Sequence, residues 1–394
     1  MELLYQLRCL GYAEIGDAIW FPNLYFNALV KMNKITGKIE ALEKFTDYNI
    51  RCRFLFSTAV SIEGYLVFIP NESREIISYH VLTGRYHSVS LDYKMTGKES
   101  TLFGNACVYN QYVYMFPTRS RCVVRYDVKS NSIRYLDCGI AAALRDVPSE
   151  ETCFIMQYEM IDGKIYLPFS CINAIAVFDP DRETMDIKYL TIKGGCTTIS
   201  GYKGKLYLAS AGENRIYECD KQDLSIFSYP CPETPCAEAS LYSYSAVIGE
   251  KIFFFPFSGG MILSMDAKTK EIREEYEIQN NGHEVGSVYY VGRSGERFLA
   301  ITAENESFSQ LCYENGKMRL IPFYGQDCQY NRKTISEYLL KHLFNEIQYE
   351  EEESLEECIN LISAADISVE YNQRENCGST IYNRLCDYRK GCVL

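Results

Sequence analysis

The sequence predicts an all-β fold, namely a β-propeller of seven four-stranded blades with a small helical extension at the C-terminus. Three observations support this prediction. A pair of strands recurs about every 47 residues, a proline recurs at one place in the repeat, and the strand pattern stops after about residue 324. Such a period is typical of propellers, because each four-stranded unit buries its faces only against its neighbours. Six or eight blades are the alternatives.

Each repeat contains a short apolar strand followed by a strand that ends in an acidic or turn-forming residue. The strands with this ending are Ala28–Asn33, Ile76–His80, Val123–Asp127, Ile175–Asp179, Ile216–Asp220, Ile262–Asp266 and Ser309–Glu314. Their last residues are spaced 47, 47, 52, 41, 46 and 48 residues apart. Where the last residue is Asp, its carboxylate can accept N–H bonds from the turn that follows, so we expect it to fix the chain reversal.

The clearest unit runs from Tyr244 to Glu277. Its four predicted strands are Ser245–Ile248, Lys251–Pro256, Met261–Asp266 and Glu271–Tyr276. Two apolar central strands between more polar ones are typical of a blade packed on both faces.

A proline ends the second strand of most units. The apolar-proline pairs are Phe21-Pro22, Ile69-Pro70, Phe116-Pro117, Leu167-Pro168 and Phe255-Pro256, and the fifth and seventh units have Ala209 and Thr302 instead. Proline donates no ladder hydrogen bond, so it stops the strand and opens the next loop. The closure of the ring has two alternatives, because Leu3–Leu7 alternates like a strand and could complete the last blade in place of Lys317–Ile321.

The segment Lys164–Leu190, KIYLPFSCINAIAVFDPDRETMDIKYL, resembles kelch-type propeller repeats in its strand, loop, VFDP turn and outer strand. It differs from them in one respect, because a proline replaces the paired glycines after the second strand. The whole chain is similar to kelch-like propeller proteins of anaerobic bacteria. Those proteins also combine strand-final prolines with a tail that ends near Gly-x-x-Ile-Tyr, here Gly378–Tyr382. The resemblance implies a propeller and no particular activity.

Composition restricts the classes of partner. The net charge of −12 argues against a general binder of nucleic acid or of anionic membranes, since such a binder needs a dominant basic field. We expect no membrane span and no secretion signal, because Met1–Gly16 has no apolar core and no run approaches 18 apolar residues. The 17 cysteines are therefore expected to be reduced thiols of a cytoplasmic protein.

The sequence divides into a propeller, residues 1–324, and a helical tail, residues 325–394. Thr334–Phe344 places Ile335, Tyr338, Leu339 and Leu343 on one helical face, and Ser354–Glu357 has the spacing of a capping box. The tail is expected to pack on one blade or cover one face of the propeller. The alternative is an arm that docks a partner.

Loops after second strands and loops before first strands share one side of a propeller, around the mouth of the central channel. We call this side the loop face. The candidate ligand-binding residues on it are Arg51, Arg53, Arg74, Arg119, Arg121, Arg145, Arg215, Tyr25 and Asn27. Arginine forks bind carboxylate, sulfate or phosphate groups, so these residues could gather an anion. The alternative is that they are solvated loop charges or partners of acids such as Glu72, Asp146 and Glu213.

His283-Glu284 is the candidate general acid/base pair, because it is the only histidine expected on the loop face with an adjacent carboxylate. No metal site and no cofactor are expected. The chain has four histidines and no Cys-x-x-Cys, and its nearest cysteine pair is Cys231 and Cys236.

The function predicted from sequence is a non-catalytic binding or scaffold propeller that recognises a protein, peptide or glycan on its loop face. The alternative is a carbohydrate-active enzyme, of the epimerase, lyase or hydrolase type, that acts on an acidic or phosphorylated sugar. In that case arginines would hold the anion, and His283 with Glu284 would transfer protons. Whether the protein is an enzyme is left open by the sequence, which favours the non-catalytic function.

Overall fold

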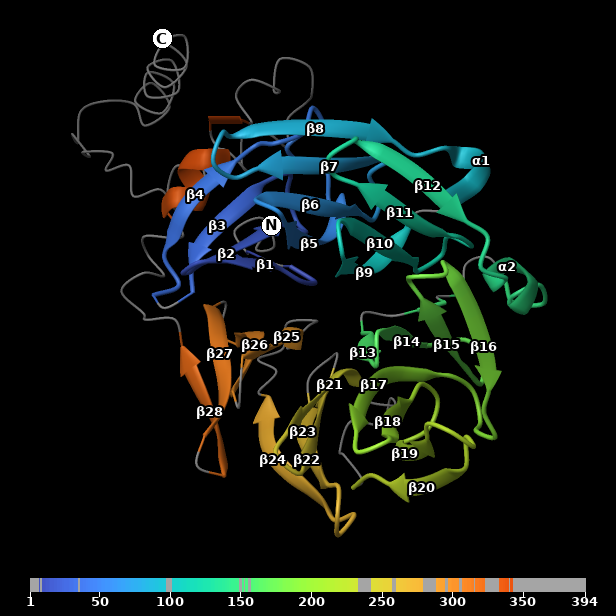
Figure 1. Ribbon diagram of the computed structural model, residues 1–394. Coiled ribbons are helices and arrows are strands. Elements are labelled where there is room, and N and C mark those ends of the chain that lie inside the picture. Colours follow the sequence, from blue (N-terminus) through green and yellow to red (C-terminus); the bar gives the residue numbers. More distant parts are fainter. Residues whose placement is uncertain are drawn as a thin grey trace.

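The computed structural model describes residues 7, 9–34, 36–96, 101–148, 151, 153–154, 157–232, 242–256, 260–278, 288–294, 297–304, 307–314, 316–322, 333–339 and 341–342. Its strands form seven four-stranded antiparallel sheets, each made of four consecutive strands. The seven-bladed propeller predicted from the repeat is therefore confirmed. Figure 1 shows the blades around a central axis, with the first strand of each blade innermost.

The first four blades use the strands β1 to β16. Blade 1 comprises β1 (Ala13–Ile15), β2 (Ala18–Pro22), β3 (Leu29–Asn33) and β4 (Ile39–Glu43). Blade 2 comprises β5 (Phe56–Ile62), β6 (Tyr65–Pro70), β7 (Glu75–His80) and β8 (Arg85–Ser90). Blade 3 comprises β9 (Phe103–Tyr109), β10 (Tyr112–Pro117), β11 (Val123–Asp127) and β12 (Ser132–Leu136). Blade 4 comprises β13 (Glu159–Ile161), β14 (Lys164–Pro168), β15 (Ala174–Asp179) and β16 (Thr184–Tyr189).

The last three blades use β17 to β28. Blade 5 comprises β17 (Cys196–Tyr202), β18 (Lys205–Ser210), β19 (Arg215–Asp220) and β20 (Ile226–Pro230). Blade 6 comprises β21 (Tyr242–Ile248), β22 (Lys251–Pro256), β23 (Gly260–Asp266) and β24 (Ile272–Ile278). Blade 7 comprises β25 (Val288–Ser294), β26 (Arg297–Glu304), β27 (Ser307–Glu314) and β28 (Lys317–Pro322). Short helices α1 (Tyr93–Thr96) and α2 (Ile140–Ala143) lie in the connections between blades.

The strand ends agree with the sequence. All seven third strands end at the predicted residue, and five second strands end at the predicted proline. The fourth strand of blade 7 is β28, so the chain does not use Leu3–Leu7 in its place. Of that alternative segment, residues 3–6 lie outside the described residues.

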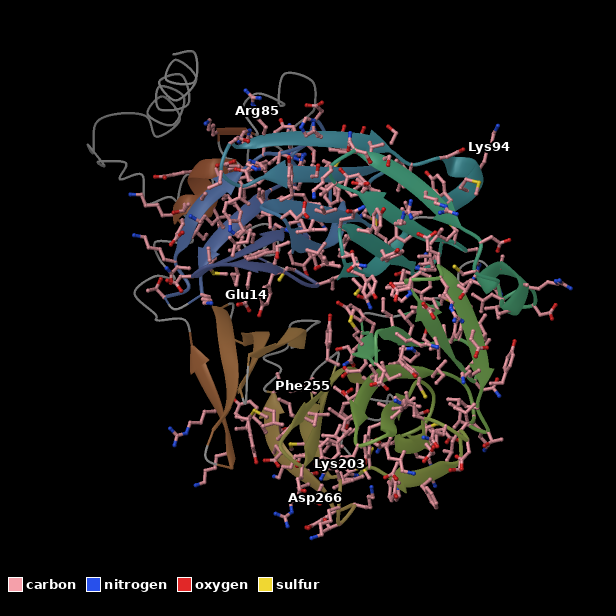
Figure 2. All side chains as sticks on the ribbon, in the orientation of Figure 1. Glu14, Arg85, Lys94, Lys203, Phe255 and Asp266 are labelled. Carbon is pink, nitrogen blue, oxygen red and sulfur yellow. The ribbon has the colours of Figure 1, made fainter. Side chains whose placement is uncertain are left out.

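The acid at the end of the third strand fixes the turn, as predicted. In blade 6 the Oδ1 atom of Asp266 accepts hydrogen bonds from Lys268 N at 2.9 Å and Thr269 N at 2.8 Å. Figure 2 shows Asp266 beside this outer turn. The acids Asp127, Asp179 and Asp220 bond their own turns in the same way. Asn33 replaces the acid in blade 1 and accepts from Thr36 N at 3.0 Å.

In blades 1 to 6, the fourth residue after the end of the third strand is left-handed. It is glycine in blades 1 and 2, where Gly37 has a φ of 70° and Gly84 a φ of 67°. Glu183 in blade 4 and Lys270 in blade 6 take the same conformation at 53° and 66°. Both side chains reach the preceding blade, Glu183 to Arg125 at 2.5 Å and Lys270 to the buried Glu218. Ion pairs between blades thus replace the glycine that the turn geometry would favour.

A chain of backbone hydrogen bonds joins neighbouring blades on the loop face. In each bond, an N–H of the segment that leads into one blade is the donor. The acceptor is a carbonyl that follows the second strand of the blade before it. The four bonds run from Phe54 to Leu24 at 2.7 Å, Leu102 to Asn71 at 2.8 Å, Cys153 to Thr118 at 2.7 Å and Cys196 to Phe169 at 2.7 Å. Within blades 2 to 5 a second bond continues the chain, as from Asn71 N to Leu55 O at 2.9 Å. Blades 1 to 5 are therefore linked through main-chain atoms.

Buried side chains fill the spaces between adjacent blades. Between blades 1 and 2, Phe45 lies with its ring centroid 5.5 Å from that of Phe56 and 4.6 Å from that of Phe68. Comparable clusters join each successive pair of blades up to blades 6 and 7. Each blade is thus stabilised mainly by its neighbours, as the repeat predicts.

The described part of the tail is helical at residues 333–339 and 341–342 and packs on blade 1. Ile335, Tyr338 and Leu339 are buried in one cluster with strands β2 and β3. Tyr338 contacts Phe26 at a centroid distance of 5.9 Å and donates its hydroxyl to Asn27 O at 2.7 Å. The rest of the predicted tail, including Ser354–Glu357, lies outside the described residues, and the division at residue 324 stays a prediction.

Gly195 is required where blades 4 and 5 meet. A Cβ atom at this position would lie 2.3 Å from Phe169 O and from Ser170 O, which are backbone atoms. The sequence analysis did not single out this glycine, because its role depends on contacts with residues from the neighbouring blade.

We predict that Gly195→Ala lowers the free energy of unfolding by about 1–3 kcal/mol or more, because the backbone of both blades must move apart. Urea denaturation monitored by circular dichroism measures this loss. Gly212→Ala is the matched control, since no atom lies within 4 Å of its added Cβ. Equal stability of the two variants would contradict this role of Gly195.

We predict that Leu339→Ala destabilises the protein by about 2–5 kcal/mol, the range for a fully buried leucine. The exposed neighbour Glu337 provides the control variant Glu337→Ala, which should change stability by less than about 0.5 kcal/mol. If thermal unfolding of both variants matched the parent protein, the helix would not be part of the folded core.

The turn acids predict a dependence of stability on pH. The hydrogen bond from Lys205, with those from Gln222 N and Asp223 N, lowers the pKa of Asp220 to about 2. An ordinary Asp has a pKa of about 3.9, so this carboxylate stabilises the fold above about pH 4 and loses that effect as the pH falls towards 2. The stability gap between the parent protein and Asp220→Asn should therefore be full at pH 6 and close near pH 2.

Denaturant titrations across this pH range measure the gap. Asp146→Asn, a change at an exposed aspartate outside the turns between third and fourth strands, is the control variant. A gap for Asp220→Asn that widened on acidification would contradict the assigned role of its carboxylate.

Candidate functional site: the central channel and the loop face

The first strands of six blades line a cavity on the central axis. Its volume is about 690 Å³, within the size range of small-molecule sites. Its walls come from β1, β5, β9, β13, β17 and β21 and from the residues that precede β1 and β13. Figure 2 shows Glu14 on β1, at the inner edge of blade 1.

On the wall formed by blades 4 to 6, polar side chains bond one another. Gln157 donates from Nε2 to Ser245 O at 2.6 Å, and its Oε1 accepts from Ser245 N at 2.8 Å and Ile199 N at 3.3 Å. The hydroxyls of Ser200 and Ser245 lie 2.7 Å apart. Gln157 is 8% exposed, so its amide joins three blades from within the wall.

On the wall formed by blades 1 to 3, polar groups are less engaged. Asn105 is 5% exposed, and its Nδ2 atom is buried with no hydrogen-bond partner. Thr58 is half-buried, Ser61 is exposed, and the side chain of Glu14 is 41% exposed. These residues offer hydroxyl, amide and carboxylate groups to a ligand.

The charged residues in the described lining are both acidic, Glu14 and Glu159. Cys107 also lines the cavity, but burial raises the pKa of its thiol to about 11, so it stays protonated at neutral pH. Among the described residues, no group of three or more His, Cys, Asp or Glu side chains is arranged to hold a metal ion. The cavity therefore presents neutral and acidic groups to its contents.

None of the seven predicted arginines is among the residues that line this cavity. Two of them bond neighbouring loops and strands. Arg121 donates to Cys153 Sγ at 2.8 Å and to Pro148 O at 3.0 Å, while Arg215 donates to Ser228 Oγ at 2.6 Å. Arg119 is half-buried with its Nε unpaired, and Arg74 is half-buried. Arg51, Arg53 and Arg145 are exposed.

Asn27 and Tyr25 occupy different environments. Asn27 is 2% exposed and donates from Nδ2 to Thr46 Oγ1 at 2.6 Å and to Tyr48 O at 2.7 Å, so its amide holds the loop that leads to blade 2. Tyr25 is half-buried and contacts Phe54 edge to face at 6.2 Å. The candidate acid/base pair His283-Glu284 lies outside the described residues.

Phe54 has an unusual backbone conformation on the loop face. Its φ is 54°, and its side chain is 38% exposed. The equivalent positions before the first strands of blades 3 and 5 are Thr101, with a φ of 66°, and Gly194, with a φ of 67°. A left-handed conformation costs a bulky residue about 1–2 kcal/mol, and glycine avoids that cost. The chain thus keeps an exposed aromatic ring where the repeat also accepts glycine.

The sequence analysis found the loop face but missed the channel wall. The missed residues are polar groups within first strands, among them Thr58, Asn105, Ser200 and Ser245. Residue type alone did not indicate them, because both faces of most first strands contribute to the lining, as in the unbroken run from Thr58 to Ser61. Phe54 carried no signal either, since its backbone angle cannot be read from residue type.

No protein-family model matches the chain, and no curated protein matches it in sequence. Several solved structures are similar in three dimensions. A streptogramin B lyase matches with a TM-score of 0.53 and 14% identity, over 79% of this chain and 92% of that one. The WD40 repeats of RRP9 match with a TM-score of 0.52 and 11% identity, over 75% and 88%.

A chain of the mitotic checkpoint complex matches with a TM-score of 0.52 and 10% identity, over 76% of this chain and 85% of that one. At such low identity these likenesses show the fold alone. The protein belongs to the β-propeller class, and its structural neighbours include WD40-type propellers. Within the described part of the chain, no helix is long and apolar enough to span a membrane.

Proposed function

We propose that this protein is a kelch-like binding propeller that recognises a protein, peptide or glycan on its loop face. The observation that carries the proposal is the exposed, left-handed Phe54. Proteins tolerate such strain where the surrounding structure imposes it, most often at binding and catalytic sites. Structural neighbours with the same fold, such as a chain of the mitotic checkpoint complex, provide a precedent for assembly with other proteins.

The residues around Phe54 favour a protein or peptide partner with acidic groups. Tyr25 supports the Phe54 ring edge to face, and Arg51 and Arg53 are exposed in the same loop. We call these four residues the Phe54 patch. Aromatic residues and arginine are the types most enriched at the energetic centres of interfaces. The two guanidinium groups would attract and orient carboxylates on the partner.

We further propose a cytoplasmic location in a bacterial cell. Nine cysteines among the described residues, Cys138 included, are free thiols that are buried or half-buried, as expected where thiols stay reduced. Burial raises the pKa of Cys138 to about 12, so its thiol is inert rather than reactive. Mass spectrometry of alkylated protein from bacterial cells would test this point, with disulfides between these cysteines as the contrary result.

We predict that Phe54→Gly weakens partner binding by at least about tenfold, because it removes an aromatic anchor. The same change should alter the free energy of unfolding by less than about 1 kcal/mol, since release of backbone strain offsets the lost contact with Tyr25. Peptides selected by display on the whole protein provide the ligands, and fluorescence anisotropy gives the dissociation constants.

The control is Phe227→Ser, which removes an exposed phenylalanine from the outer strand β20, where the side chain is 57% exposed. Its affinity for the selected peptides should equal that of the parent protein. Peptides that bind Phe54→Gly and the parent protein equally would refute the patch as the recognition site. A display that yields no binder would also count against the proposal.

A further inference from the structure

The central cavity has two chemically different walls. On the side of blades 4 to 6, Gln157 uses both ends of its amide within the protein, and Ser200 and Ser245 bond each other. Tyr244 donates its hydroxyl to Leu10 O at 3.1 Å across the channel wall. These groups already have partners, so they give the wall its shape and have little hydrogen-bonding capacity left for a ligand.

The wall of blades 1 to 3 contains a buried amide that the fold does not satisfy. Asn105 Nδ2 has no partner, although Gln157 shows that a buried amide in the same channel can be fully bonded. A buried unpaired donor destabilises the protein, so a site that keeps one needs an explanation. Asn105 is one of the residues that line the cavity, and a rotation of its amide about the Cβ–Cγ bond would exchange the positions of Nδ2 and Oδ1.

Neighbouring groups on this wall suit a ligand with several hydroxyls. Thr58 Oγ1 donates a long hydrogen bond to Ala59 O at 3.4 Å and can still accept, and the exposed Ser61 hydroxyl can donate and accept. Glu14 accepts a long contact from Lys34 at 3.5 Å and its side chain is 41% exposed, so part of its carboxylate is accessible to a further donor. Apolar groups, among them Val60 and Val108, lie between these polar residues. Such a mixture of apolar surface and a few placed polar groups is typical of small-molecule sites.

The charge of the lining selects against anions. Among the described lining residues, the charged ones are Glu14 and Glu159 on opposite walls, so a carboxylate or phosphate between them would be repelled. The seven arginines predicted from the sequence, which would favour an anion, are not among these lining residues.

We propose that the channel binds a small, polyhydroxylated molecule without negative charge, of the size of a monosaccharide or disaccharide. Asn105 donates to one of its hydroxyl oxygens, and Thr58 and Glu14 bond its remaining hydroxyls. This site is separate from the Phe54 patch, whose residues do not line the cavity. The two proposals can therefore fail independently.

Isothermal titration calorimetry on the full chain tests the site. The probes are glucose, galactose, mannose, maltose and lactose as neutral sugars, glucosamine as a cation, and glucuronate and glucose 6-phosphate as anions. At least one neutral sugar should bind, and its anionic counterpart should bind at least about tenfold more weakly. Absence of binding by every neutral sugar up to about 50 mM would overturn the proposal, as would tighter binding of the anions.

Asn105→Leu keeps a similar volume and removes the donor. It should weaken binding of the neutral sugar by about tenfold and leave the melting temperature equal or higher, because an unpaired polar group is lost. Gln111→Leu changes an exposed amide on the hairpin of the same blade and should bind as the parent protein does. Equal affinity in the parent protein and Asn105→Leu would refute the role of Asn105.

Glu14→Gln provides a second variant at a partly exposed position, where folding is least at risk. The ratio of the dissociation constants of glucuronate and glucose should fall by several-fold in this variant, since one of the two repelling charges in the described lining is removed. An unchanged preference would show that the acidic lining does not select the ligand.

Discussion

The fold depends on the chain of backbone hydrogen bonds that runs along the loop face. Each bond joins an amide that leads into one blade to a carbonyl that follows the second strand of the blade before it, as from Cys153 to Thr118. Because peptide groups make these bonds, side chains on the loops are free to vary without loosening the ring. Gly195 shows how closely the backbones approach where blades 4 and 5 meet.

This arrangement explains how the loop face can hold a strained residue. Phe54 donates its own N–H to Leu24 O of blade 1 and accepts from Glu72 N of blade 2 at 3.0 Å, so bonds to two blades fix its peptide groups. The surrounding bonds hold the backbone of Phe54 at its left-handed φ angle, and its ring is exposed on the loop face as a result. The position of the Phe54 ring on the loop face therefore follows from the same bonds that hold the blades together.

Much of the fold could be predicted from the sequence. The strand ends at Asp127, Asp179, Asp220 and Asp266 follow from local chemistry, since an acid can bond its own turn. The prolines that end second strands are also local signals. The ion pair between Lys270 and Glu218 could not be predicted, because it depends on which residues face each other across a junction between blades.

The candidate sites were harder to predict for the same reason. A count of arginines on the loop face says nothing of their partners, and Arg121 proves to bond Cys153 and Pro148 in the following connection. Residue type alone also failed to indicate Asn105, which is distinguished by the missing partner of its amide. Packing around the channel, and not spacing along the chain, decides which polar groups are left for a ligand.

Hydrogen exchange measured by NMR on the whole protein tests the central claim most directly. The amides of Leu102, Cys153 and Cys196 should exchange as slowly as that of Phe68 in the middle of β6, with the same dependence on denaturant, because opening any of these links requires global unfolding. Fast exchange of the three link amides in a protein whose strand amides stay protected would contradict the account. In that case the blades would be held by side-chain packing, and the loop face would move independently of them.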